Sequence, residues 1–335
     1  MTWWKERAAT RPHRLIVDAG GLMVPNPSAL TEREGEAVAR ADVFGTVMAQ
    51  MGYAAQHVGV HELALGLAEL RKWSAKHRIP LLSTNVYTTD GKPAFQRTLS
   101  RKVGMLQVCM LGLMSDSPPD LGRNVLDQGL AVREPAAEAK AAVRELEGQG
   151  CELIVLLSQL RRQEIEKVVA AAPGIDLVLG STDMDLTMQL TTMGKGLYAD
   201  AFTKGKYVGE VVASIGERKD QFVAANLRAS LQSERVNLAQ QVQSFQAQLE
   251  TANTPGGPLQ LNAETRQVME RQLAAARARL QRVTMDLEGV FESPKGASTL
   301  DLVMTALGTD VKDDPAVDKV VQKLKEKYPK APGAH

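Results

Sequence analysis

The feature that most constrains this chain is an alternation of short apolar runs with amphipathic segments. Strand-like apolar runs occur at residues 13–22, 55–60, 79–87, 151–158 and 175–179. Segments with the spacing of amphipathic helices lie between them, at 32–51, 63–77, 134–149 and 162–172. Such an alternation predicts an α/β fold built on a largely parallel sheet. An antiparallel hairpin is predicted in addition, at 96–102 and 106–113.

The composition is that of an ordinary globular chain. The 335 residues include 40 lysines and arginines against 39 aspartates and glutamates, so the formal net charge is only +1. Because the chain has no basic field, we expect no nucleic-acid partner. No apolar run approaches the roughly 20 residues that span a bilayer, so no membrane span is expected. The first residues lack the apolar segment of a signal peptide, which implies a cytoplasmic protein or a start downstream of the natural one.

The two cysteines, Cys109 and Cys151, both lie in apolar, strand-like runs. A buried cysteine behaves as a small apolar residue, so this placement favours two buried free thiols over a disulfide or a metal-binding pair. The sequence has no C-x-x-C motif, and neither a structural zinc site nor a c-type haem is predicted.

The hydrophobic pattern changes near residue 219. Apolar residues recur every seven positions from Leu231 to Phe245, and again from Met269 to Val290. A Thr-Pro-Gly-Gly-Pro turn at 254–258 separates the two series. Two heptad helices around such a turn predict an antiparallel coiled-coil hairpin.

These patterns divide the chain into three parts. We expect an α/β domain over residues 1–218, a coiled-coil hairpin over 219–293, and short helices with a disordered tail over 294–335. The short helices are predicted at 299–307 and 314–328. The second helix has an aspartate as N-cap and a proline at its first position.

Polar residues follow two of the predicted strands. Asp18 ends the first run, and the pair His61 and Glu62 follows the strand at 55–60. The loops beyond the C-terminal ends of strands are where α/β proteins place their functional side chains. The sequence therefore predicts a site at this edge of the sheet, or the remains of one.

Seven motifs in a fixed order carry a family resemblance. They are V-D-A-G (17–20), M-G-Y-A-A-Q-H-V-G-V-H-E (51–62), P-L-L-S-T-N-V-Y (80–87), V-G-M-L-Q-V-C-M-L-G-L (103–113), E-L-I-V-L-L-S-Q-L (152–160), P-G-I-D-L-V-L-G (173–180) and G-K-Y-V-G-E (205–210). Residues 14–216 thus resemble the N-terminal domain of the 5′-nucleotidase branch of the calcineurin-like metallophosphoesterases. The resemblance implies a four-layer α/β/β/α sandwich with two metal ions at the C-terminal ends of its strands.

The chain departs from the ligand set that the resemblance implies. Members of the family hold two divalent cations through carboxylate, histidine and asparagine ligands. The matching positions here are occupied by Gly21, Val60, Gln159, Thr182 and Met184, and the chain does not contain the family's D-x-H segment. Glycine, valine and methionine side chains cannot hold hard divalent cations. We therefore expect that the metal pair is lost and that no cofactor binds.

Several polar residues remain at the predicted site. His61 and Glu62 match the family's catalytic motif and form a vestigial catalytic pair, with Ala64 in place of the aspartate that would orient the histidine. The candidates for binding a ligand in the old cleft are Asp18, Asn85, Gln159 and Asp183, with His57 and Asp185 at the same strand ends.

The resemblance implies a catalytically degenerate phosphoesterase-like protein, a scaffold that acts through its coiled coil. Two alternatives stay open: a residual phosphohydrolase of nucleotidase type centred on His61, and an anion- or nucleotide-binding module in the old cleft. The implied partner is another protein or a second copy, bound through residues 219–293. Family context adds a multihaem cytochrome as an associated protein. It also implies a periplasmic location, although the missing signal peptide keeps a cytoplasmic one open.

Overall fold

The computed structural model describes residues 1–24, 34–117, 128–182, 186–202, 205–225, 227–253, 262–289, 296–308 and 311–329. The chain divides into two compact units. The first comprises Met1–Val212, Lys219–Phe222 and Leu302–His335, and the second comprises Ala213–Arg218 and Val223–Asp301. Among the described residues, no helix is both long enough and apolar enough to cross a membrane.

The first sheet has three short parallel strands. Their order is β1 (Val17–Asp18), β2 (Ala55–His57), β3 (Leu81–Leu82). The helices α2 (Glu34–Met51), α3 (Val60–Leu63) and α4 (Leu67–His77) connect or follow these strands. Buried side chains of α2 and α4, among them Met48, Leu70 and Trp73, pack in one cluster with Val58 and Leu81 of the sheet region. This burial of one helix face against the sheet is what the helical spacing predicts.

The second sheet has six strands in the order β10-β11-β9-β8-β6-β5. In chain order they are β5 (Thr98–Val103), β6 (Leu106–Met114), β8 (Leu153–Gln159), β9 (Leu177–Gly180), β10 (Thr191–Met193) and β11 (Gly196–Asp200). The hairpin of β5 and β6 is antiparallel as predicted, and β6, β8, β9 and β11 run parallel. Two helices, α6 (Pro135–Gly148) and α7 (Arg162–Ala171), bury Leu146, Ile165 and Val168 in one cluster with Leu156 of the sheet.

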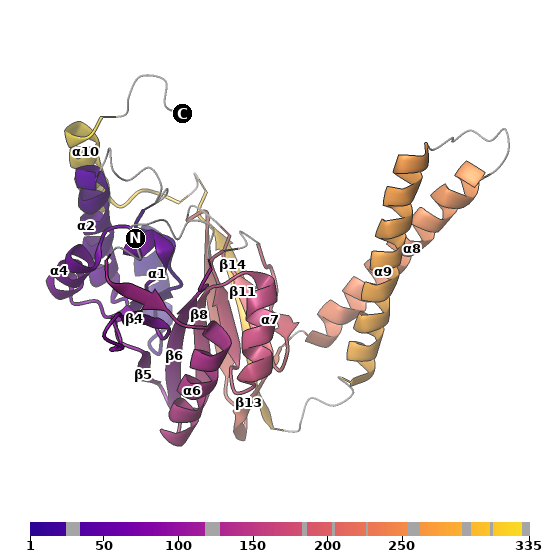
Figure 1. Ribbon diagram of the computed structural model, residues 1–335, viewed down its shortest axis with the longest axis horizontal. Helices are drawn as coiled ribbons and strands as arrows, with labels where there is room; N and C mark the ends of the chain where they lie inside the picture. The colour runs from indigo at the N-terminus through magenta and orange to yellow at the C-terminus, as the bar shows by residue number, and fades with distance from the viewer. Residues whose placement is uncertain are drawn as a thin grey trace. The chain divides into compact units, whose positions relative to one another are not determined.

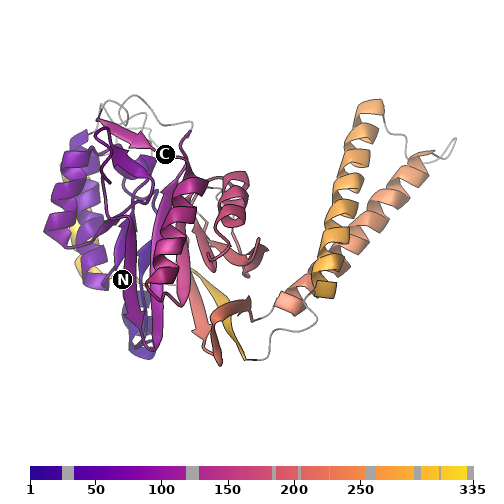
Figure 2. The same cartoon turned by 60° about the horizontal axis from the view of Figure 1, so that its bottom comes forward.

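The two sheets lie between the two helix layers, with α2 and α4 on one side and α6 and α7 on the other (Figures 1 and 2). A mixed α/β fold with a sheet core is therefore confirmed. The sheets are joined at Gly112 of β6, whose carbonyl accepts a hydrogen bond from the Thr84 amide at 2.7 Å. A small two-stranded sheet of β4 (Val86–Thr88) and β7 (Leu130–Val132) adds to this region.

Gly112 is also where a side chain would not fit. A Cβ added there would lie 2.4 Å from Nδ1 of the buried His57. We expect Gly112→Ala to lower the free energy of unfolding by about 3 kcal/mol, because overpacking a dense core forces neighbours to move. Urea unfolding checks this value. The control is Gly148→Ala at the end of α6, where an added Cβ meets nothing within 4 Å and no loss is expected. Equal stability of the two variants would contradict the prediction.

Two long helices follow the α/β part. They are α8 (Leu227–Asn253) and α9 (Ala263–Gly289). Val242 of α8 packs with Leu273 and Ala276 of α9, and Arg279 Nε donates to Glu234 Oε1 at 2.8 Å. These contacts use the heptad positions, while the coiled-coil geometry itself stays a prediction.

Three local expectations are wrong. Residues 218–224 form strand β13 (Arg218–Ala224), so helix α8 begins eight residues later than the predicted 219. Residues 299–307, predicted as a helix, belong to strand β14 (Ala297–Ala306). β14 lies between β13 and β12 (Tyr207–Ser214) in a three-stranded sheet, which supplies the backbone partners that a sequence pattern does not reveal.

The third wrong expectation is that the two cysteines are free thiols. Cys109 of β6 and Cys151, just before β8, form a disulfide with a Cα–Cα distance of 5.8 Å, so the thiols are not free. The terminal elements are α1 (Thr2–Thr10), which the sequence pattern missed, and α10 (Pro315–Lys327). As predicted, α10 has Pro315 at its first position, and the Asp314 carboxylate caps it.

Candidate functional site

The candidate site lies where the C-terminal ends of the parallel strands of the two sheets meet. Asp18 ends β1, Gly59 follows β2, and Gln159 ends β8. Contacts between the sheets hold this edge together. Ser181, directly after β9, donates through Oγ to the Ala19 carbonyl at 3.0 Å. The topology therefore gathers residues that are more than 100 positions apart into one place.

Glu62 is the centre of this place and is fully buried. Its Oε1 accepts hydrogen bonds from three consecutive backbone amides, those of Gly21 at 2.9 Å, Leu22 at 2.9 Å and Met23 at 3.4 Å. Its Oε2 accepts from the Gly59 amide at 3.1 Å, which also fixes the start of α3. A buried carboxylate is stable only with such a set of donors. Glu62 thereby holds the loop after β1 against the loop after β2.

Gln159 is the fifth hydrogen-bond donor to the Glu62 carboxylate. Its Nε2 donates to Glu62 Oε2 at 3.0 Å. The amide group occupies the space beside two glycines, since a Cβ added at Gly20 or at Gly59 would lie 1.9 Å from it. Gly20 also has a positive φ of 91°, a conformation that suits glycine. The centre of the candidate site is therefore filled by the protein's own side chain.

Asp18 lies beside this group and is half-buried. Its Oδ1 accepts from the Gly20 amide and from Nε2 of the fully buried Gln56, both at 2.8 Å. Burial and the nearby Glu62 carboxylate raise the pKa of Asp18 to about 6, although these two hydrogen bonds oppose the shift. Burial, with the Asp18 carboxylate, also raises the pKa of Tyr53.

Replacing Asp18 by asparagine should therefore stabilise the protein at neutral pH. The folded-state pKa of about 6 lies above the ordinary 3.8, so the ionised carboxylate costs stability above pH 6 and the cost vanishes below 3.8. We expect Asp18→Asn to gain about 2 kcal/mol at pH 8, because the amide oxygen can keep both hydrogen bonds. Urea unfolding at pH 8 and at pH 4 checks this. A gain that is equal at both pH values would contradict it.

His57 lies between the sheets and is fully buried. Its Nδ1 is 3.0 Å from the Leu82 carbonyl oxygen, and its Nε2 is 3.1 Å from that of Leu113. Burial lowers the pKa of His57, while the Leu82 carbonyl, the Glu62 carboxylate and the Leu113 carbonyl act in the opposite direction.

His61 and Asn85 have partners within the protein. His61 Nδ1 is 2.6 Å from the Val24 carbonyl oxygen. Asn85 is fully buried, and its Nδ2 donates to the Met114 and Arg133 carbonyls at 2.8 and 2.9 Å. Its Oδ1 accepts from the Met114 amide at 3.2 Å. Asn85 thus ties β6 to the segment after β7.

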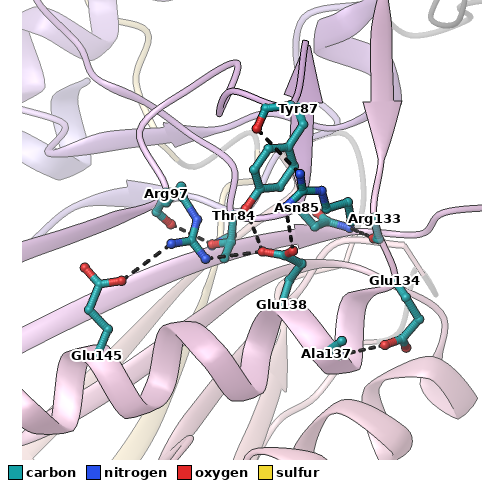
Figure 3. Close-up of polar contacts among 11 residues, drawn as sticks. Thr84, Asn85, Tyr87, Arg97, Arg133, Glu134, Ala137, Glu138 and Glu145 are labelled. Carbon is teal, nitrogen blue, oxygen red and sulfur yellow. Dashed lines mark hydrogen bonds and ion pairs between the residues drawn. The ribbon is translucent and has the colours of Figure 1, made fainter. Parts of the chain in front are cut away.

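A second polar cluster lies next to Asn85, centred on Glu138 of α6 (Figure 3). Glu138 accepts from the Tyr87 hydroxyl at 2.7 Å and pairs with Arg97 at 3.2 Å and with Arg133 at 3.4 Å. The Arg133 guanidinium also stacks over the Tyr87 ring, 3.5 Å from its centroid. Each charge has a partner within the cluster, which ties α6 to β4 and to the residue just before β5.

Comparison with known proteins finds similar sequences for part of this chain. UshA of Escherichia coli is 32% identical over 98 residues, which cover 29% of this chain and 18% of UshA. A 5′-nucleotidase of Vibrio vulnificus is 28% identical over 144 residues, or 42% of this chain and 26% of that protein. The matched parts therefore span about a fifth to a quarter of these relatives. No protein-family model matches the chain.

The fold is shared with solved structures. The calcineurin-like phosphoesterase YfkN of Bacillus subtilis aligns with a TM-score of 0.51 at 17% identity, over 62% of this chain and 73% of YfkN. The 5′-nucleotidase precursor of Thermus thermophilus aligns with a TM-score of 0.50 at 22% identity, over 65% and 45%. The chain thus resembles the 5′-nucleotidase branch of the calcineurin-like metallophosphoesterases in part of its sequence and in its fold.

The structure brings together part of the site that the resemblance implies. Asp18, Glu62 and Gln159 meet around the loop of Gly20 and Gly21, while His61 and Asn85 bond elsewhere. Asp183, Met184 and Asp185 lie outside the described residues. Thr182 is exposed, and Val60 packs in the apolar cluster of α2 and α4. Among the residues that the structure describes, no three histidines, cysteines or acidic residues are grouped so that they could hold a metal ion.

Sequence reasoning missed two contributors. Gln56 bridges Asp18 and the His57 carbonyl, and Ser181 ties the loop after β9 to Ala19. Gln56 could have been recognised from the sequence, because a glutamine in the middle of a buried strand requires hydrogen-bond partners. Ser181 could not have been recognised, since serines are common in such turns.

Proposed function

We propose that this chain is a catalytically degenerate member of the 5′-nucleotidase branch that acts as a non-catalytic scaffold. The observation that carries the proposal is the hydrogen bonding of Glu62 at the candidate site. The Glu62 carboxylate already accepts hydrogen bonds from four backbone amides and the Gln159 amide. A carboxylate saturated by N–H donors has no lone pair left for a cation.

This donor set does not fit a pair of hard divalent cations. Such ions need several oxygen or imidazole ligands that converge on one point. Here the Gln159 side chain fills the space between Gly20 and Gly59, and Gly21 contributes only its backbone amide. The proposal therefore includes the loss of the family's metal pair.

Metal analysis combined with an activity assay tests the scaffold proposal. We expect the purified full chain to bind less than one equivalent of transition metal after incubation with manganese or zinc. We also expect no hydrolysis of a generic phosphodiester above background. Two bound equivalents together with hydrolysis would overturn the proposal.

A residual phosphohydrolase is the second candidate function. The contact of His61 Nδ1 with the Val24 carbonyl favours it, because a carbonyl only accepts, so Nδ1 carries a proton and the ring orientation is fixed. An assay with nucleoside monophosphates would support this function if turnover disappeared in His61→Ala. Turnover that is absent, or unchanged in the variant, would exclude it.

An anion- or nucleotide-binding cleft is the third candidate. The amides of Gly21, Leu22 and Met23 would suit a phosphate group, but Glu62 already occupies them. We therefore expect no rise in melting temperature with phosphate or nucleotides. A ligand-dependent rise would favour this function over the scaffold.

The helix pair α8 and α9 is the proposed docking element for a protein partner or a second copy. Several apolar side chains on it face solvent, including Val236 at 50% and Met285 at 61% exposure. A photo-crosslinking residue in place of Met285 should capture a protein in cells, and the mass of the adduct distinguishes a second copy from another partner. The control position is the exposed Lys102 on β5. Capture no greater at 285 than at 102 would contradict the proposal. The multihaem cytochrome implied by family context stays a prediction.

The disulfide supports an oxidising compartment, and we propose a periplasmic location. Disulfides such as Cys109–Cys151 persist in the periplasm and are reduced in most cytoplasms. Alkylation of thiols in intact cells with a thiol-reactive polymer checks this. We expect no mass shift before reduction and two adducts after it.

A further inference from the structure

His57 occupies an unusual position between the two sheets. It lies at the end of β2, and its ring reaches both the Leu82 carbonyl of β3 at 3.0 Å and the Leu113 carbonyl of β6 at 3.1 Å. The ring has space because residue 112 is a glycine, whose missing Cβ would lie 2.4 Å from Nδ1. One side chain therefore connects both sheets of the sandwich at the edge that carries the candidate site.

The two contacts cannot both be hydrogen bonds of a neutral ring. A backbone carbonyl only accepts, and a neutral imidazole carries a proton on one nitrogen alone. In either tautomer the lone pair of the other nitrogen would then face a carbonyl oxygen in a fully buried place. An uncompensated contact of this kind is costly, because no water can replace the missing donor. Only the imidazolium donates to both carbonyls.

The surroundings contain a counter-charge for that imidazolium. Glu62 of α3 is the charged group that acts on His57, and β3 and β6 present carbonyl oxygens and Gly112. Asp18 of β1, the other acidic group here, lies close enough to Glu62 for their charges to interact. Burial is the largest influence and lowers the pKa of His57, whereas the Glu62 carboxylate and the two carbonyls oppose that shift. The contact of both ring nitrogens with carbonyl oxygens, which a neutral ring cannot satisfy, decides for the charged form.

We infer that His57 carries a proton in the folded protein at neutral pH and joins the two sheets as an imidazolium. This connection through His57 is sensitive to pH, because loss of the proton turns one of the two hydrogen bonds of the ring into a contact between lone pairs. Alkaline pH is then expected to loosen the connection between β2 and β6, next to the candidate site.

Nitrogen NMR on the full chain with 15N-labelled histidine tests the inference. The chain has five histidines, His13, His57, His61, His77 and His335. At pH 7.5 we expect one of them to show two protonated ring nitrogens, and we expect its signal to vanish in His57→Gln. If that variant does not fold, variants at the other four positions assign the signal by exclusion. An unprotonated nitrogen on His57 at this pH would overturn the inference.

The pH dependence of stability gives an independent test. A proton held by the folded state and released by the unfolded chain makes stability fall as pH rises. The difference in melting temperature between the wild type and His57→Gln should therefore narrow as the pH rises above about 6.5, the ordinary pKa of histidine. His77→Gln, which removes the buried histidine beside Asp42 on α2, is the matched control. A gap that widens with pH would overturn the inference, since it indicates a neutral His57.

Discussion

Glu62→Ala is expected to lower the free energy of unfolding by about 4 kcal/mol. The substitution removes the acceptor of five donors at once, four backbone amides and the Gln159 side chain. Each buried donor left without a partner costs about 1–3 kcal/mol, and partial entry of water reduces the sum. Equilibrium unfolding in urea measures the effect.

Two further variants make this result specific. Glu62→Gln keeps one oxygen acceptor but places an amide N–H₂ against backbone amides, so we expect a loss of about 2 kcal/mol. Glu69→Ala on α4 removes an acidic residue that pairs with Lys72 at the surface, and we expect a change within about 0.5 kcal/mol. If Glu62→Ala costs no more than Glu69→Ala, Glu62 does not organise the strand-end loops.

Removal of the disulfide should have an effect of similar size. Cys109 and Cys151 are 42 residues apart, and closing such a loop restricts the unfolded chain. The chain-entropy relation gives about 4 kcal/mol for a loop of this length. We expect the Cys109→Ala/Cys151→Ala variant to unfold at a clearly lower urea concentration than the oxidised protein.

Reductant provides the matched comparison for the disulfide. The wild type with reductant should approach the double variant, because both lack the cross-link. The variant itself should not respond to reductant. A wild type that reacts with thiol reagents before reduction, or that has the same midpoint with and without reductant, would contradict a structural role for this bond.

Much of the fold could be predicted because its signals are local. Helices α2, α4, α6 and α7 and strands β6 and β8 are recognisable from the spacing of apolar residues within each segment. The same reasoning failed where the pattern was short. Leu300 and Leu302 are buried at alternate positions of β14, yet the spacing of apolar residues from Thr299 to Leu307 predicts a helix. The alternation was present, but the neighbouring strands β12 and β13 that use it lie far away in the sequence.

The candidate site was predictable in part for a similar reason. The motifs place Asp18, Glu62 and Gln159 at strand ends, and parallel strands bring their C-terminal ends to one edge. The sequence also identified the non-ligand residues Gly21 and Val60. It could not identify what fills the site, because the bond from Gln159 to Glu62 joins residues 97 positions apart.

By itself, then, the sequence determined the fold class, the resemblance to the 5′-nucleotidase branch and the residue types at the positions where that branch has metal ligands, since each depends on residue type and local spacing. Only the tertiary structure decided that Cys109 meets Cys151, that Glu62 gathers five donors and that His57 reaches both sheets. These contacts depend on strand register and on the space left by Gly20, Gly59 and Gly112. Register and free space are properties of packed elements, and no segment of the chain contains them alone.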